Sequence, residues 1–151
     1  METTTHKNTA TLIHLSALSQ YIIPFGGYIL PLAIWSATKD KSEFVNAQGK
    51  QTVNFQLSLF VYSLVLAVIA IPVFCVSVLN NIPFEAFISD GDFVLKNLNL
   101  QNISGMLAVV IMAVVLFGMM KVAEFFLIIY AAVKTSNGED FKYPLTIPFL
   151  K

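Results

Sequence analysis

Three long stretches of the chain contain no charged residue, and charges return in the short segments between them. The uncharged stretches are residues 8–38, 51–84 and 97–120. A helix needs about 20 mostly apolar residues to cross a hydrocarbon core of about 30 Å. The pattern therefore predicts an all-α polytopic integral membrane protein, in which a bundle of three transmembrane segments forms a single membrane domain, 1–151.

The second and third stretches each predict one long helix. The second span is expected over residues 53–79, where Pro72 kinks the helix without ending it because neighbouring helices and water satisfy the freed carbonyl. The third span is expected over residues 103–133. Its end is marked by Lys134 in the last turn and by Asn137-Gly138, a pair that tolerates the left-handed stop conformation.

The first span, about residues 9–35, cannot be one straight helix because the sequence PFGG breaks it at Pro24-Gly27. Two half-helices are expected, one on each side of this break. They form either one bent crossing or a re-entrant hairpin whose ends share a side, and the sequence does not separate the two. A cleavable signal peptide fits poorly, since no small-residue cleavage site follows, and we expect the segment to be retained.

Composition and charge narrow the class of protein. Apolar residues make up 56% of the chain and charged residues only 12%, with a net charge of zero, whereas soluble domains carry about 25% charged residues. This balance excludes a disordered chain and a nucleic-acid binder. The expected partners are the lipid bilayer and either further copies of the chain or other membrane proteins.

The lysines predict the orientation, because cytoplasmic flanks retain positive charge. Segments 36–51 and 134–151 contain three Lys each, whereas segment 80–102 contains one Lys and three acids. We therefore expect a cytoplasmic loop at 36–51, an acidic external loop at 80–102 and a cytoplasmic C-terminal tail at 134–151. The expected location is the bacterial plasma membrane, with several passes. If the first stretch is a crossing, the N-terminus lies outside.

Three ionisable residues fall within the predicted spans and are candidates for a functional role. Lys121 and Glu124 are three residues apart and face one side of the third helix. Charges inside a span suggest function by default, but the structural alternative is that the two neutralise each other. His14 either bonds across helices or senses pH.

No arrangement of residues indicates catalysis. The sequence contains no nucleophile, phosphate-binding or metal-ligand motif, and no paired carboxylates share an apolar stretch. We therefore expect a protein that is not an enzyme and that has neither a cofactor nor a metal site.

Several segments carry a family resemblance. They are HLSAL with PFGG and LPLAIW, then KDKSEFVNAQGKQTVNFQLSLFVY, and finally AAVKTSNGEDFKYPLTI. Together they resemble the DUF4870 or Tic20-like family of small membrane proteins over nearly the whole chain, apart from residues 80–102. The resemblance implies a helical membrane protein with three to four segments, whose charged loop and Tyr-Pro tail are cytoplasmic. Its plastid relatives serve protein import, which reaches this chain only by analogy.

The strongest matched residues lie at the cytoplasmic ends of the predicted spans. We hypothesise that they form a cytoplasmic cap, in which the loop after the first span contacts the tail; its candidate residues are Phe44, Lys50, Asn54, Gln56, Glu139, Tyr143 and Pro144. The expected function is that of a non-enzymatic assembly or protein-translocation accessory component. The alternative is a small-solute or proton/ion conduit lined by His14, Lys121 and Glu124, motivated by the broken first segment.

Overall fold

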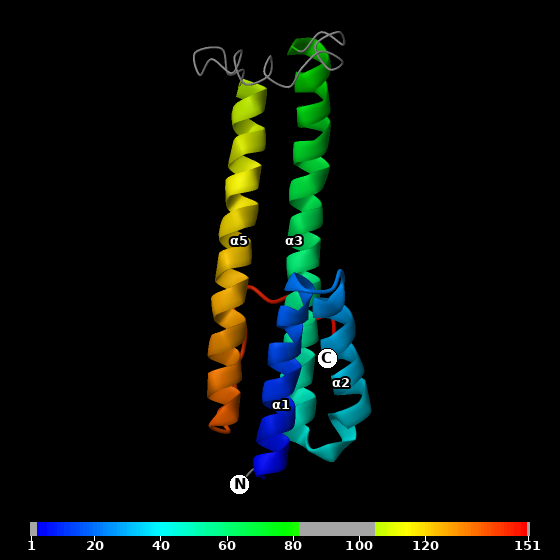
Figure 1. Ribbon diagram of the computed structural model, residues 1–151, viewed down its shortest axis with the longest axis vertical. Helices are drawn as coiled ribbons and strands as arrows, with labels where there is room; N and C mark the ends of the chain where they lie inside the picture. The colour runs from blue at the N-terminus through cyan, green and yellow to red at the C-terminus, as the bar shows by residue number, and fades with distance from the viewer. Residues whose placement is uncertain (1–2, 82–104, 151) are drawn as a thin grey trace. The chain divides into compact units, whose positions relative to one another are not determined.

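The protein is all-helical in the part described by the computed structural model, residues 3–81 and 105–150. The described residues form four α-helices and two short 3₁₀ helices (Figure 1): α1 (Thr4–Ser16), η1 (Ala17–Tyr21), α2 (Gly26–Thr38), η2 (Lys39–Lys41), α3 (Glu43–Asn81) and α5 (Gly105–Ser136). Neither described range contains a β-strand. The all-α class is confirmed, while the predicted acidic loop lies outside the described residues except for its first two positions, which belong to α3.

Two helices in the described ranges are long and apolar enough to cross a membrane. They are Glu43–Val76 within α3 and Ala108–Ser136 within α5, and only 6% and 11% of their most apolar windows are buried. A core helix of a soluble protein would be mostly buried, so the exposed apolar side chains favour lipid contact. The predicted third crossing is not confirmed.

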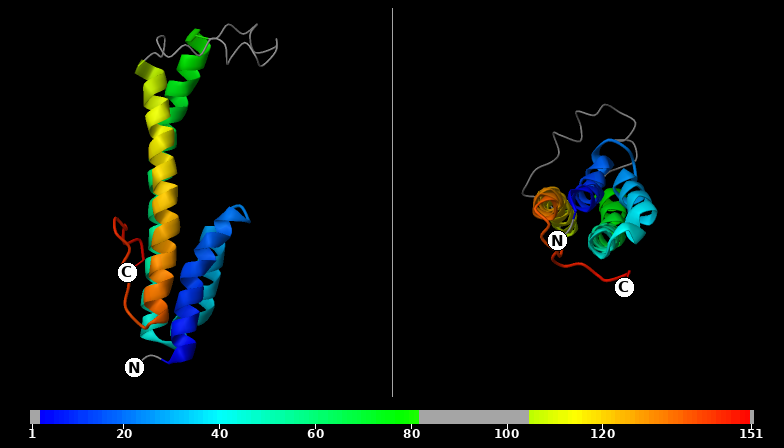
Figure 2. Two further views of the ribbon diagram at one scale, coloured as in Figure 1. Left: turned by 60° about the vertical axis from the view of Figure 1, so that its left-hand side comes forward. Right: turned by 90° about the horizontal axis from the view of Figure 1, so that it is seen from below.

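The N-terminal segment is instead a hairpin of α1 and α2, which lie side by side and run in opposite directions (Figures 1 and 2). Each helix has 13 residues, or about 20 Å at 1.5 Å per residue. The turn falls at the predicted break, and a Cβ at Gly27 would approach the Ala17 carbonyl oxygen to 2.8 Å. Glycine therefore permits the close packing that folds the two half-helices together.

Contacts to other segments show where the two ends of the hairpin lie. Both are close to the start of α3 or to the end of α5. The Lys7 ammonium donates to the Asn137 carbonyl directly after α5 (3.3 Å). From α2, the Trp35 indole donates to the Asn46 side chain in the first turns of α3 (3.0 Å). The structure therefore folds the two half-helices into a hairpin.

Helix α3 begins at Glu43, ten residues before the expected start of the second span at residue 53. Ser42 caps the helix, because the backbone N–H of Val45 donates to the Ser42 hydroxyl (3.1 Å). The negative charge of Glu43 in the first turn is stabilised by the positive end of the helix dipole. Most of segment 36–51, expected as a loop, is consequently helical. At the other end, α5 stops where Gly138 takes a φ of 83°, which agrees with the Asn-Gly stop signal.

Contacts divide the chain into two compact units: residues 1–61 with 120–151, and residues 62–119. The first unit has a core of Ala10, Ile13, Phe44 and Val45, against which Trp35 packs. A Cβ at Gly49 would overlap the Trp35 ring, so glycine is required there. The second unit displays apolar side chains such as Val68 and Met112, each 65% exposed.

Candidate functional site

A polar network inside the first unit centres on Glu124, which is 1% exposed. The Lys121 ammonium lies 2.8 Å from Glu124 Oε2, and the side chains are 28% and 0% exposed respectively. The two residues are one turn apart on α5, as their spacing predicted. A carboxylate this deeply buried is stable only if charge and hydrogen bonds compensate for its lost hydration.

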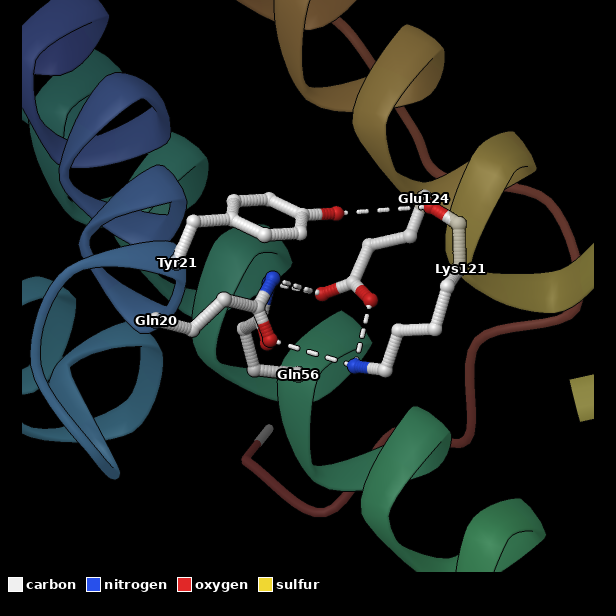
Figure 3. Close-up of polar contacts among 5 residues, drawn as sticks. All are labelled: Gln20, Tyr21, Gln56, Lys121 and Glu124. Atoms are coloured by element: carbon white, nitrogen blue, oxygen red, sulfur yellow. Dashed lines mark hydrogen bonds and ion pairs between the residues drawn. The ribbon is translucent and has the colours of Figure 1, made fainter. Parts of the chain in front are cut away.

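Two glutamines from other helices complete that compensation (Figure 3). Glu124 Oε1 accepts from Gln20 Nε2 in η1 (2.6 Å) and from Gln56 Nε2 in α3 (3.1 Å). The Lys121 ammonium also donates to Gln20 Oε1 (3.1 Å). The network therefore joins the hairpin, α3 and α5 through one carboxylate, and we call these four residues the Glu124 clamp.

The local fold explains why Gln20 reaches Glu124. The chain tightens from α1 into η1 directly before the turn, and a Cβ at Gly27 would come within 2.9 Å of Gln20 Cβ. Glycine at this position thus lets α2 pack against η1 and support Gln20. The neighbouring Tyr21 hydroxyl donates to the Lys121 carbonyl (3.4 Å), and its ring meets Phe125 edge to face, with centroids 6.1 Å apart. These contacts cover one side of the Glu124 clamp.

His14 belongs to a second polar cluster in the same unit. Its Nε2 lies 3.1 Å from Gln48 Oε1, and its Nδ1 lies 2.9 Å from the Tyr143 hydroxyl and 2.8 Å from Thr52 Oγ1. Gln48 Nε2 in turn donates to Asp140 Oδ1 (3.2 Å). We call these five residues the His14 cluster.

The hydrogen-bond pattern assigns the proton positions in the His14 cluster. Because the Gln48 amide donates to a carboxylate, its oxygen faces His14, and His14 Nε2 must carry the proton. Nδ1 is then an acceptor, and the Tyr143 hydroxyl donates to it. Burial raises the pKa of the Tyr143 phenol above its ordinary range, so this donor stays neutral. The result is a directed chain of hydrogen bonds that ties the tail to α1 and α3.

The candidate cap residues have different surroundings. Asn54 contacts the tail, pairing with the backbone of Leu150 in both directions (3.0 and 2.8 Å). Tyr143 is buried and its ring stacks on Phe55, with centroids 4.0 Å apart. Gln56 contributes to the Glu124 clamp instead of the tail contact. The remaining candidates are Phe44 in the core, Lys50 at a half-buried position on α3, Pro144 on the surface, and Glu139, which pairs with Lys134 at 3.2 Å.

The sequence analysis missed Gln48, Thr52 and Ser58, which complete these clusters alongside the candidates Asn54 and Gln56. Gln48, Thr52 and Gln56 are spaced four apart on α3, and Asn54 and Ser58 form a second pair with the same spacing. Such spacing places each set on one face of a helix. The first set faces His14 and Glu124, and the second faces the tail. A polar stripe at this interval within an apolar span is the signal that would have identified them.

In both clusters the polar side chains bond to one another. Glu124 spends its oxygens on Lys121 and two amides, and the described residues contain no group of three or more metal-binding side chains. The described residues thus form an all-helical protein with two candidate membrane-spanning helices, and buried hydrogen bonds join the segments of its first unit. The chain belongs to the MamF/MmsF family, the magnetosome magnetite crystal formation protein family, which matches residues 5–150. No curated protein and no solved structure matches the chain.

Family membership corrects two expectations. The resemblance to the DUF4870 or Tic20-like family was wrong, because the matching family is MamF/MmsF. The expected function was an assembly or protein-translocation accessory component, with a conduit motivated by the broken first segment as the alternative, and this expectation was wrong for the same reason. The segments that carried the resemblance include the hairpin turn, the start of α3 and the tail. They build the fold, and a fold does not by itself indicate function.

Proposed function

We propose that the chain is a non-enzymatic membrane protein that takes part in magnetite crystal formation at the membrane of a mineral-bearing compartment. The observation that carries this proposal is the family match over residues 5–150. The two candidate membrane helices support it by supplying the attachment.

The buried polar residues support a structural role for the described part of the chain. In the Glu124 clamp, the carboxylate accepts from Gln20 and Lys121. In the His14 cluster, the imidazole is hydrogen-bonded to Tyr143 of the tail. In this proposal the Glu124 clamp and the His14 cluster hold the segments together in lipid. The mineral contacts surfaces outside these two clusters.

The hairpin suggests the topology. In this proposal α3 and α5 cross the bilayer, while α1 and α2 enter it from the side of the N-terminus and leave on the same side. Each half-helix, about 20 Å long, reaches near the middle of a core of about 30 Å. The lysine-rich end, which includes Lys39 and Lys41, is cytoplasmic by the positive-inside rule. The segment between α3 and α5 then faces the lumen of the compartment.

Precipitation of magnetite beside vesicles tests the function. The purified full chain is reconstituted in lipid vesicles, ferrous and ferric iron are co-precipitated with base, and crystal diameters are measured by electron microscopy. We expect a shifted and narrower distribution of diameters than with vesicles carrying an unrelated two-span protein at equal density. Identical distributions would contradict the proposal. Association with further copies or other membrane proteins stays a prediction, which crosslinking in native membranes checks.

A further inference from the structure

The chain after α5 turns back and runs along α3 (Figure 2). The backbone N–H of Ile147 donates to the Ser58 hydroxyl (2.8 Å), and Leu150 pairs with the Asn54 amide through both its N–H and its carbonyl. We call residues 144–150 the strap. Side chains of α3 thus satisfy backbone groups that a helix or sheet would otherwise satisfy, which non-helical chain requires at membrane depth.

The attachment points on α3 indicate the depth of the strap. Lys50 is the last charged residue of α3, so the boundary between water and lipid lies near it. At 1.5 Å per residue, Asn54 and Ser58 lie about 6 and 12 Å further along the helix. The polar layer of a bilayer is about 5 to 7 Å thick on each side of the hydrocarbon core. The strap is therefore level with the boundary between headgroups and acyl chains.

The outward side of the strap is apolar. Leu145 is 85% exposed, Phe149 46% and Ile147 37%. Such a cluster beside a membrane-spanning helix matches the lipid-facing side of interfacial segments, which bury their apolar face about 5–10 Å into this boundary. Lys142 precedes the strap and is exposed, a position from which it meets anionic headgroups.

The turn that opens the strap gives a second, independent indication. Pro144 is followed by Leu145 with a φ of 55°, a left-handed backbone conformation that glycine or asparagine adopts at lower cost. Leucine accepts the unfavourable backbone conformation and displays a large apolar side chain. A surface in water gains nothing from this choice, whereas a surface in lipid does.

We propose that the strap is an interfacial anchor, which inserts Leu145, Ile147 and Phe149 into the lipid leaflet on the side of the termini. The tail beyond α5 is then not a soluble extension. It lies in the membrane surface, and its polar backbone is turned toward α3.

Spin-label accessibility in lipid vesicles tests this anchor. In the full chain with Cys75→Ala, single cysteines replace Leu145 or Phe149, with Phe126→Cys as the lipid reference and Glu139→Cys as the water reference. Phe126 is 65% exposed on α5, and the Glu139 side chain is 56% exposed. Oxygen reports lipid contact and a water-soluble nickel chelate reports water.

Labels at 145 and 149 are expected to relax with oxygen as the label at 126 does and to be protected from nickel. A nickel response equal to that at 139 overturns the anchor. Protection from both reagents also overturns it, because the strap would then be covered by protein, such as a second copy of the chain. All four positions are exposed, so the fold is expected to tolerate each label.

Discussion

The two parts of helix α3 contrast sharply in which side chains they bury. Between Glu43 and Val61, polar side chains such as Gln48, Thr52 and Gln56 are buried, each 2% exposed or less. Between Tyr62 and Val76, apolar side chains such as Val68 are exposed. In water this would be an inverted protein, whereas in lipid the apolar side chains face their solvent and the polar ones bond to each other. The polar part of α3 therefore determines how the segments pack together, and the apolar part provides the surface for membrane attachment.

The largest effect is expected from removing the centre of the Glu124 clamp. Glu124→Ala removes the carboxylate that pairs with Lys121 and that accepts from the buried Gln56 amide and the half-buried Gln20 amide, which should lower the free energy of unfolding by about 3–5 kcal/mol. Denaturant unfolding in detergent micelles, followed by circular dichroism, measures it. Phe126→Ala, on the same helix but exposed, is the matched control and should change stability by about 0.5 kcal/mol or less. Equal losses in the two variants would show that the clamp does not hold the segments.

A pair of glycines tests the contrast along the helices directly. Gly49→Ala forces a Cβ into the Trp35 ring and should cost about 1–3 kcal/mol. Gly118→Ala has nothing within 4 Å of the added Cβ and should gain up to about 1 kcal/mol from helix propensity. Melting temperatures of the two purified variants should therefore move in opposite directions. A shift of both in the same direction would contradict the packing described for the first unit.

A similar or smaller loss is expected where α3 holds the tail. Asn54→Leu removes both hydrogen bonds to Leu150, at about 0.5–1.5 kcal/mol each. The loss of stability should be accompanied by faster proteolysis within residues 144–150, measured by mass spectrometry of timed digests. Gln51→Leu, half-buried one turn earlier, is the control. If the tail of Asn54→Leu is cut no faster than that of the control, the pairing is not what holds it.

The smallest effect concerns the hydroxyl that links the tail to His14. Tyr143→Phe keeps the ring on Phe55 and removes one buried donor, which should cost about 0.5–1.5 kcal/mol. Tyr130→Phe, where the ring is 53% exposed, should cost less. The same denaturant unfolding compares them. The proton assignment in the His14 cluster fails if Tyr143→Phe is as stable as the parent chain.

Local features of the fold could be predicted from the sequence. The break at PFGG, the Asn-Gly stop and the facing of Lys121 and Glu124 depend on neighbouring residues only, and the structure shows all three. The early start of α3 was missed because the apolar pattern begins later than the Ser42 cap. The antiparallel packing of the half-helices was left open, because it depends on the space around Gly27, which no periodicity records.

The candidate site was predictable only in part for the same reason. Gln20 and Gln56 reach Glu124 across 104 and 68 positions of sequence, and such contacts follow from the fold alone. The assignment of Asn54 and Gln56 to one cap could have been questioned, since residues two apart on a helix point about 200° apart. They do face different partners.

In the proposed topology, the first segment enters and leaves the membrane on one side. Single cysteines at Thr4, Lys41 and Ser136, all exposed, are introduced with Cys75→Ala and treated with an impermeant maleimide in intact cells and in inverted vesicles. All three are expected to label from the same side, because the hairpin places its N-terminal end near the start of α3 and the end of α5. Labelling of Thr4→Cys from the side opposite to Lys41→Cys would mean that the first segment crosses, and would contradict this topology.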